Sequence, residues 1–131
     1  MAEYPKDLKY TKDHEWARLE KGGLVRVGIT AYAVEQLGDV TLVDLPKVGS
    51  KLAVGTRFGD IESVKTVSEL FAPATGEVVE TNGALEGQPE LVNESTYDKG
   101  WMMLLRVGNA GELEALMDSA AYETYLGTLD H

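Results

Sequence analysis

The chain has 131 residues, 44% of them hydrophobic and 26% charged, which is an ordinary composition for one globular domain. Its net charge of −10 argues against binding to nucleic acid or to an anionic membrane through bulk electrostatics. The absence of cysteine excludes disulfides, thiolate metal sites and a cysteine nucleophile.

The N-terminal segment MAEYPKDLKY is polar, and we expect about ten residues here to be peripheral to the fold. It lacks the apolar segment of a signal peptide, and no apolar run in the sequence approaches membrane-spanning length. We therefore predict a cytoplasmic bacterial protein, with the mature form of a mitochondrial protein as the alternative.

The following segments predict a β hairpin and then a short helix. HEWARLE, with Trp16 pointing inward, and LVRVGIT read as strands on either side of a KGG turn. AYAVEQLG has helical composition and ends at Gly38, so we expect a helix near residues 31–37. The β-branched segment DVTLVDLP predicts another strand, which ends before Pro46.

Short β-branched segments and glycine turns then alternate up to residue 108. KTVSELFAP, EVVETN and the continuous apolar run WMMLLRVG read as strands, and a long loop has room for a short strand at Leu91 and Val92. In residues 111–127 the apolar spacing changes to that of helices, with Asp118 and Ser119 as caps of a second short helix. We predict one mainly β domain over residues 1–131, a sandwich or barrel with C-terminal helices.

Lys65 is the candidate functional residue. It joins two β-branched runs, IESV and TVSEL, at the expected tip of a hairpin. An amine on a four-carbon stem at such a tip suits the attachment of a swinging cofactor arm, and acylation removes its charge. If the protein takes part in sulfur chemistry, the sulfur has to be brought in from outside, because the chain has no cysteine.

Four blocks of sequence carry a resemblance that covers most of the chain. YTKDHEW, VGITAYAVEQLGDVTLVDLP, DIESVKTVSELFAPATGEVVETN and LVNESTYDKGWMMLLRV resemble, in this order, the H proteins of the glycine cleavage system. General lipoyl domains and biotin carriers share the hairpin lysine but lack the HEW and YDKGW blocks. The resemblance implies a lipoyl-carrier-type sandwich of two antiparallel sheets, with lipoate attached to Lys65.

The resemblance also implies a function and a set of partners. An H protein is a carrier and catalyses nothing alone. It takes an aminomethyl group from a pyridoxal-phosphate glycine decarboxylase to a tetrahydrofolate-dependent aminomethyltransferase, and a flavin-dependent (FAD) dihydrolipoyl dehydrogenase reoxidises its dithiol. Lipoate-attaching enzymes modify the lysine, and we expect the protein to be a monomer. The alternatives are a relay that donates lipoyl groups to other complexes and an unmodified acidic interaction domain.

The family match further implies a cleft that shelters the arm, lined by Asp13, Glu15 and Glu69. Carboxylates there would face the cationic amine of the cargo, with water excluded. Asp13 and Gln36 stand where some members have serine and histidine, so the roles of these two residues stay open. His14 is interpreted as structural, and no metal site is predicted. The residues expected to be recognised by the modifying enzyme are Glu62, Ser63, Val64 and Thr66.

Overall fold

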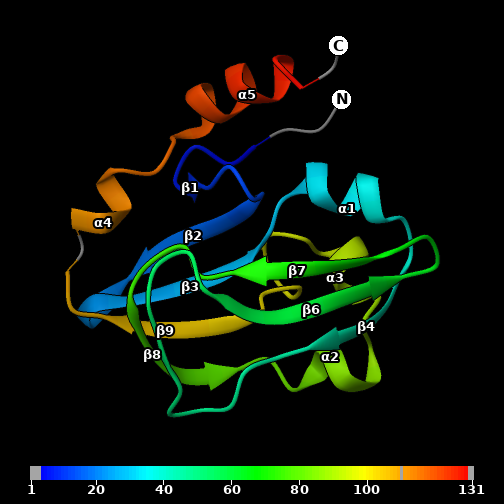
Figure 1. Cartoon of the computed structure of the whole chain (residues 1–131), viewed down its shortest axis with the longest axis horizontal. Coiled ribbons are helices and arrows are strands. Elements are labelled where there is room, and N and C mark those ends of the chain that lie inside the picture. The colour runs from blue at the N-terminus through cyan, green and yellow to red at the C-terminus, as the bar shows by residue number, and fades with distance from the viewer. Residues whose placement is uncertain (1–3, 110, 130–131) are drawn as a thin grey trace.

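The computed structural model describes residues 4–109 and 111–129 and is mainly β (Figure 1). The strands are β1 (Lys9–Tyr10), β2 (Glu15–Glu20), β3 (Leu24–Ile29), β4 (Val40–Asp44), β5 (Lys51–Leu52), β6 (Arg57–Ser63), β7 (Val67–Phe71), β8 (Gly76–Thr81) and β9 (Met103–Val107). They form a six-stranded sheet in the order β1-β2-β3-β9-β8-β5 and a three-stranded sheet in the order β4-β6-β7. All the pairings are antiparallel, which confirms the predicted fold of two antiparallel sheets.

The predicted hairpin of β2 and β3 is present, with the 3-10 turn η1 (Lys21–Gly23) between the strands. Gly22 and Gly23 both have a φ of 75°, a conformation that glycine adopts without steric cost. The main core lies between the two sheets, where apolar residues alternate with outward-facing polar residues along the strands. Val25, Val27, Val78 and Leu105 are completely buried there.

The helices are α1 (Ala31–Leu37), α2 (Ala84–Gly87), α3 (Leu91–Glu94), α4 (Gly111–Glu114) and α5 (Ser119–Gly127). The helix predicted near residues 31–37 is confirmed: Thr30 caps its start and Gly38 its end. The strand predicted at Leu91 and Val92 is wrong, because these residues form the turn of α3, where the Ser95 amide donates to the Leu91 carbonyl. Val92 is completely buried although it lies in a helical turn. Two adjacent apolar residues show no periodicity, so the sequence alone cannot distinguish a helical turn from a strand here.

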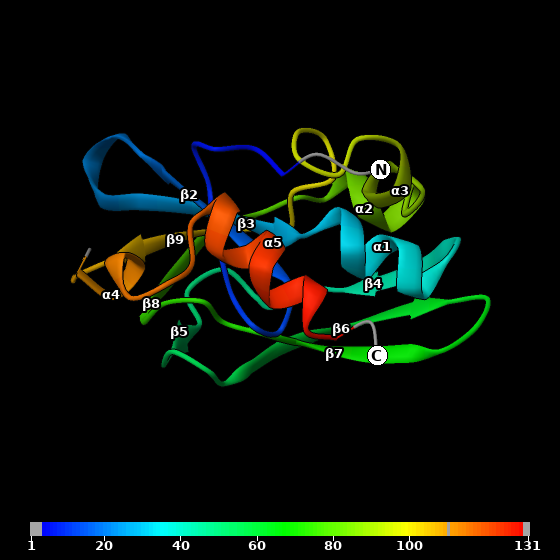
Figure 2. The ribbon, with the colours of Figure 1, turned by 90° about the horizontal axis from the view of Figure 1, so that it is seen from above.

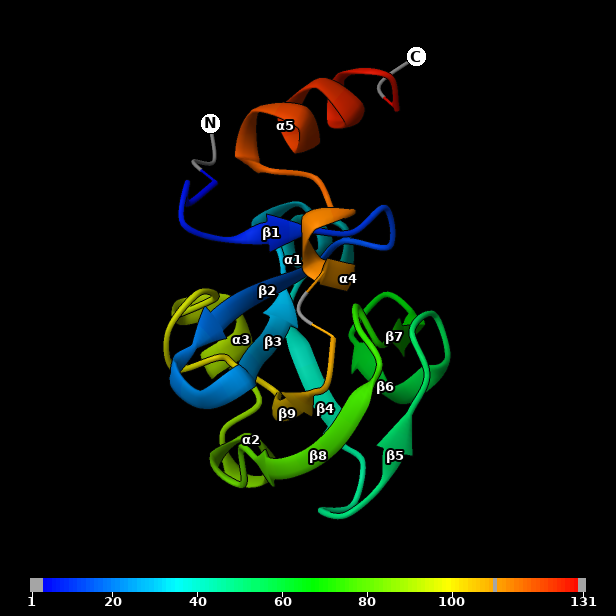
Figure 3. The ribbon, with the colours of Figure 1, turned by 90° about the vertical axis from the view of Figure 1, so that its left-hand side faces the viewer.

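Part of the N-terminal segment predicted to be peripheral is packed against the fold, as residues 4–10 show, while residues 1–3 lie outside the described residues. Leu8 and Tyr10 are fully buried in a second core cluster, together with Trp16, Tyr122 and Leu126. The rings of Tyr10 and Tyr122 stack with their centres 4.7 Å apart. In Figures 2 and 3 the C-terminal helix α5 lies with β1 over one end of the sandwich. Two apolar residues spaced among charged ones give no periodic signal, so the sequence alone did not reveal this packing.

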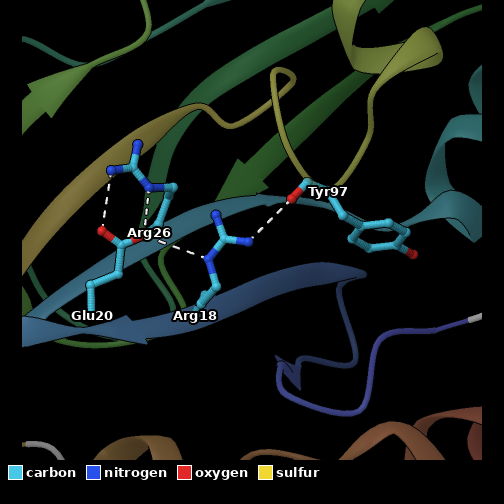
Figure 4. A network of polar contacts seen from close by, with 4 residues as sticks. All are labelled: Arg18, Glu20, Arg26 and Tyr97. Atoms are coloured by element: carbon cyan, nitrogen blue, oxygen red, sulfur yellow. Dashed lines mark hydrogen bonds and ion pairs between the residues drawn. The ribbon is translucent and has the colours of Figure 1, made fainter.

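The outer face of the β2–β3 hairpin carries a polar network (Figure 4). Arg18 and Arg26 are directly opposite in the sheet, and Glu20 accepts two hydrogen bonds from Arg26, at 2.7 and 3.2 Å. Arg18 lies 3.5 Å from the same carboxylate and donates to the carbonyl of Tyr97. The Arg26 guanidinium also covers the partly buried Trp101 ring, 4.4 Å from its centre. The Glu20 carboxylate thus pairs with two opposed cations, and Arg18 connects the hairpin to the loop after α3.

Candidate functional site

The turn between β6 and β7 is fixed by Ser63. Its amide donates to the Thr66 carbonyl at 2.8 Å, and its hydroxyl oxygen accepts from the amides of Lys65 and Thr66, both at 3.2 Å. A serine hydroxyl that pairs with backbone amides in this way defines a tight turn. Lys65 is exposed at the tip of the turn, where the sequence predicted it.

The tip is also attached to the connection between α1 and β4. The Val64 amide donates to the Asp39 carbonyl at 3.1 Å. Beside it, the Lys65 stem lies over Gly38, where an added Cβ would come within 3.3 Å of Cε and 3.8 Å of Nζ. Lys65 therefore projects from a turn that is fixed by hydrogen bonds of Ser63 and of Asp39, and its stem packs against Gly38.

A cavity of about 200 Å³ lies beside this tip, between α1 and the β6–β7 hairpin. Thr66 and Val67, the two residues after Lys65, line it. Its apolar wall comes from Ile29, Ala33, Leu37, Ile61 and Leu70. Its remaining walls are Tyr32 and the polar side chains of Asp13, His14, Gln36, Ser68 and Glu69. The cavity thus combines an apolar surface with acids.

Asp13 and Glu69, two of the three acids predicted for the cleft, meet at this cavity. They come from the loop before β2 and from β7, so the fold joins residues 56 positions apart. Glu69 is mostly exposed, and its carboxylate lies 3.6 Å from the Arg57 guanidinium. Arg57 also pairs with Asp60, and hydrogen bonding to that carboxylate is the main cause of the raised pKa of Arg57.

Glu15, the third predicted acid, lies behind the cavity wall and does not line it. Its side chain is 1% exposed, accepts a hydrogen bond from the Thr11 hydroxyl, and accepts another from the Phe71 amide at 3.2 Å. Burial raises the pKa of Glu15 to about 8, although its hydrogen bonds with Thr11 and Phe71 act in the opposite direction. The structure therefore places Glu15 outside the lining of the cavity, where its carboxyl group links β2 to the end of β7.

His14 is a cavity residue that the sequence analysis interpreted only as structural. Its φ is 70°, the one positive value among the non-glycine residues that the structure describes. Its Nδ1 lies 2.8 Å from the Tyr122 hydroxyl, which is also 2.8 Å from the Thr30 hydroxyl. Burial lowers the pKa of His14, which favours the neutral ring. No sequence pattern indicates this group, because residues 14, 30 and 122 meet only in the fold.

A family model described as the glycine cleavage H-protein matches residues 8–128. The chain belongs to this family. The glycine cleavage system H protein of Symbiobacterium thermophilum is 52% identical over 125 residues, which cover 95% of this chain and 97% of that protein. That of Brevibacillus brevis is 50% identical over 121 residues, covering 92% and 95%. The crystal structure of the H protein from Mycobacterium marinum superposes with a TM-score of 0.87 at 40% identity, covering 95% of this chain and 99% of that one.

Membership identifies this H protein as the carrier component of the glycine cleavage system, not one of its catalysts. Proteins of this family carry lipoate, as the resemblance implied. Over residues 4–109 and 111–129, no group of three or more His, Asp or Glu side chains is arranged to hold a metal ion. In the same residues no helix is long and apolar enough to cross a membrane.

Proposed function

We propose that Lys65 is the lipoyl attachment residue of this H protein and that the cavity beside it receives the end of the arm. The observation that carries this proposal is the position of an exposed lysine, on a turn held by Ser63 and Asp39, one residue from the mouth of the cavity. A rigid anchor and a flexible stem are what a tether needs, because the anchor fixes the starting point and the stem supplies the reach.

The cavity suits a lipoyl group. Its 200 Å³ is several times the volume of about 30 Å³ that one water occupies in the liquid. Ile29, Leu37, Ile61 and Leu70 offer an apolar surface to hydrocarbon and sulfur. Attached lipoate supplies a disulfide that takes up the aminomethyl group and the electrons from glycine.

The acids at the cavity suit the cargo. Asp13 and Glu69 offer negative charge where the amine of the aminomethyl group, cationic at neutral pH, enters. Two unit charges 4 Å apart attract by about 4 kcal/mol at an effective dielectric of 20, before the cost of desolvation is subtracted. The walls at the same time limit access of water, which would otherwise release the cargo.

The surface around Lys65 is suited to recognition by enzymes. Val64 and Val67 are 69% and 61% exposed, which leaves apolar side chains uncovered on both sides of the lysine. Glu62 lies on β6, directly opposite Val67 of β7. We propose that lipoate-attaching enzymes read Glu62, Val64 and the turn shaped by Ser63 and Thr66. Glycine decarboxylase, the aminomethyltransferase and dihydrolipoyl dehydrogenase would then meet the arm of a monomeric, cytoplasmic carrier.

Reconstitution tests this proposal. Co-expression with a lipoate-attaching enzyme should add one lipoyl group to the intact mass, Lys65→Arg should abolish the addition, and Lys51→Arg, at another exposed lysine, should not. With glycine decarboxylase, exchange of labelled bicarbonate with the glycine carboxyl should depend on the lipoylated chain. A mass that never changes would leave an unmodified interaction domain as the better description.

A further inference from the structure

A buried chain of hydrogen bonds ends at the wall of the arm cavity. It runs from Thr30, the N-cap of α1, through Tyr122 of α5 to His14, which lines the cavity. Three segments of the sequence meet here, so the C-terminal helix is connected to the site although its own residues are not among those that line the cavity.

The backbone holds His14 in a conformation that a histidine rarely adopts. Its φ of 70° is left-handed, while its amide donates to the Thr11 carbonyl and its carbonyl accepts from the Thr30 amide, at 3.1 and 2.9 Å. Strain of this kind persists where the surroundings determine the conformation, and it concentrates at functional sites. The ring stands between Tyr32, with ring centres 4.6 Å apart, and Tyr122.

The direction of the hydrogen bonds follows from counting protons. Thr30 is completely buried, and its hydroxyl oxygen already accepts the Ala33 amide. Among the described residues, the Tyr122 oxygen is the one acceptor for the Thr30 proton, and leaving that buried donor unpaired would be costly. Thr30 therefore donates to Tyr122, and Tyr122, whose pKa burial raises, retains its proton and donates it to Nδ1 of His14.

The proton of the neutral His14 ring is then on Nε2. In the part of the chain that the structure describes, the ring makes its hydrogen bond through Nδ1, and no buried side-chain nitrogen or oxygen lacks a partner. Nε2 is therefore accessible to solvent on a residue of the cavity wall. This N–H is a donor, whereas the neighbouring Asp13 and Glu69 are acceptors.

We propose that the Thr30–Tyr122 pair fixes His14 as its Nε2–H tautomer, and that this N–H binds the sulfur end of the arm. The inference rests on the function proposed above and deepens it. A cationic amine is attracted by Asp13 and Glu69 and is not a partner for an N–H donor. Sulfur is an acceptor, and a thiolate is a strong one. The Nε2–H donor thus binds the sulfur and the two acids bind the amine, so the loaded end of the arm has one orientation in the cavity.

Nitrogen NMR tests the tautomer on the protein as it is. The chain has two histidines, so His131→Gln leaves the His14 ring as the single histidine signal. The unmodified protein should show a protonated Nε2 and an unprotonated Nδ1. Tyr122→Phe should remove this preference, while Tyr125→Phe, on the same helix but outside the chain of hydrogen bonds, should retain it. A protonated Nδ1 in the parent protein would overturn the proposal.

The second measurement asks whether the arm reaches Nε2. The measurement compares unmodified protein with lipoylated, reduced protein, with and without the aminomethyl group. In the lipoylated forms the Nε2 resonance of His14 should be shifted, and its proton should exchange about fivefold more slowly, the factor that corresponds to one net hydrogen bond. The Lys65→Arg variant, which should carry no lipoyl group, is the reference. If the parent protein carries a lipoyl group by mass and still gives the same spectra as this variant, the contact with Nε2 is overturned while the carrier function is left intact. A missing lipoyl mass would instead refute the carrier proposal, and the tautomer result would still stand.

Discussion

The stem of Lys65 lies over the α carbon of Gly38, so close that a side chain at position 38 would touch Cε and Nζ. Gly38 has a φ of 76° and a ψ of −147°, in a region that is almost restricted to glycine. The residue therefore ends α1 and also leaves space for the lysine that we propose as the attachment site.

Gly38→Ala should lower the free energy of unfolding by about 1–3 kcal/mol, because alanine is strained in this conformation. It should also slow lipoylation, since the added methyl group displaces the Lys65 stem. Urea unfolding and a time course of intact mass measure the two effects. The control is Gly87→Ala in α2, where φ is not positive and no atom lies within 4 Å of the added Cβ. Equal lipoylation rates in the two variants would contradict the role of Gly38.

Glu15→Gln should change how stability depends on pH. The pKa of Glu15 is raised from 4.5 to about 8 in the folded protein, so the unfolded chain loses this proton first as pH rises. The contribution of Glu15 to stability is therefore complete below about pH 4.5 and is lost as pH rises to about 8, by about 1.4 kcal/mol per pH unit. Glutamine has no proton to lose, so the variant should lack this slope.

The two proteins should therefore have similar stability below about pH 4.5, and the variant should gain relative to the parent from there until about pH 8. Urea unfolding at several pH values in this window measures the difference. The other titrating groups are common to both proteins and cancel in the comparison. If the free energies of unfolding of the two proteins changed in the same way with pH, Glu15 would have an ordinary pKa, and its burial between β2 and Phe71 would be contradicted.

The sequence predicted those elements whose signals are local. The β2–β3 hairpin has a glycine turn, α1 has Gly38 at its end, and Lys65 lies between two β-branched runs, so all three were predicted correctly. The burial of Tyr10 depends on Tyr122, 112 positions away, and no local pattern reports such a contact.

The residues of the site likewise include some that the sequence indicated and others that only the tertiary structure reveals. The family resemblance implied one cleft for Asp13, Glu15 and Glu69, whereas the structure places Asp13 and Glu69 at one cavity and buries Glu15 outside its lining. Strand alternation alone does not determine that position, because the first three residues of β2 are all buried between packed elements. His14 could not be assigned because its tautomer depends on Thr30 and Tyr122, which reach it only through tertiary packing.

Glu69→Gln should release the aminomethyl cargo faster than the parent protein does. The side chain is largely exposed, so the charge it offers is screened and contributes at most about 1 kcal/mol, or a rate change of up to about fivefold. The difference should shrink at high salt, since exposed charges are screened. Formaldehyde release from loaded protein measures the rate. Glu114→Gln, an exposed acid on α4, should behave like the parent, and an equal effect in both variants would mean that bulk charge is responsible.

Asp118→Ala should loosen the helix that holds Tyr122 against His14. The Asp118 carboxylate accepts from the Ala121 amide at 2.8 Å and caps α5. Tyr122 lies in the first turn of α5, with its own amide bonded to the Asp118 carbonyl. Loss of such a cap costs about 0.5–2 kcal/mol, which thermal unfolding should report as a melting point lower by several degrees. Hydrogen exchange of the Tyr122 amide should also become faster.

Asp118→Asn provides the matched comparison, because asparagine caps helices about as well as aspartate while carrying no charge. If the cap acts through its hydrogen bond, Asp118→Asn should keep the melting point and the slow exchange of the Tyr122 amide. If the charge itself stabilised the N-terminus of α5, the asparagine variant would lose part of that stability and the loss would depend on salt. Alanine and asparagine variants with the same melting point and the same exchange rate would contradict a capping role. In that case the stacking of Tyr122 on Tyr10 would be enough to hold the helix.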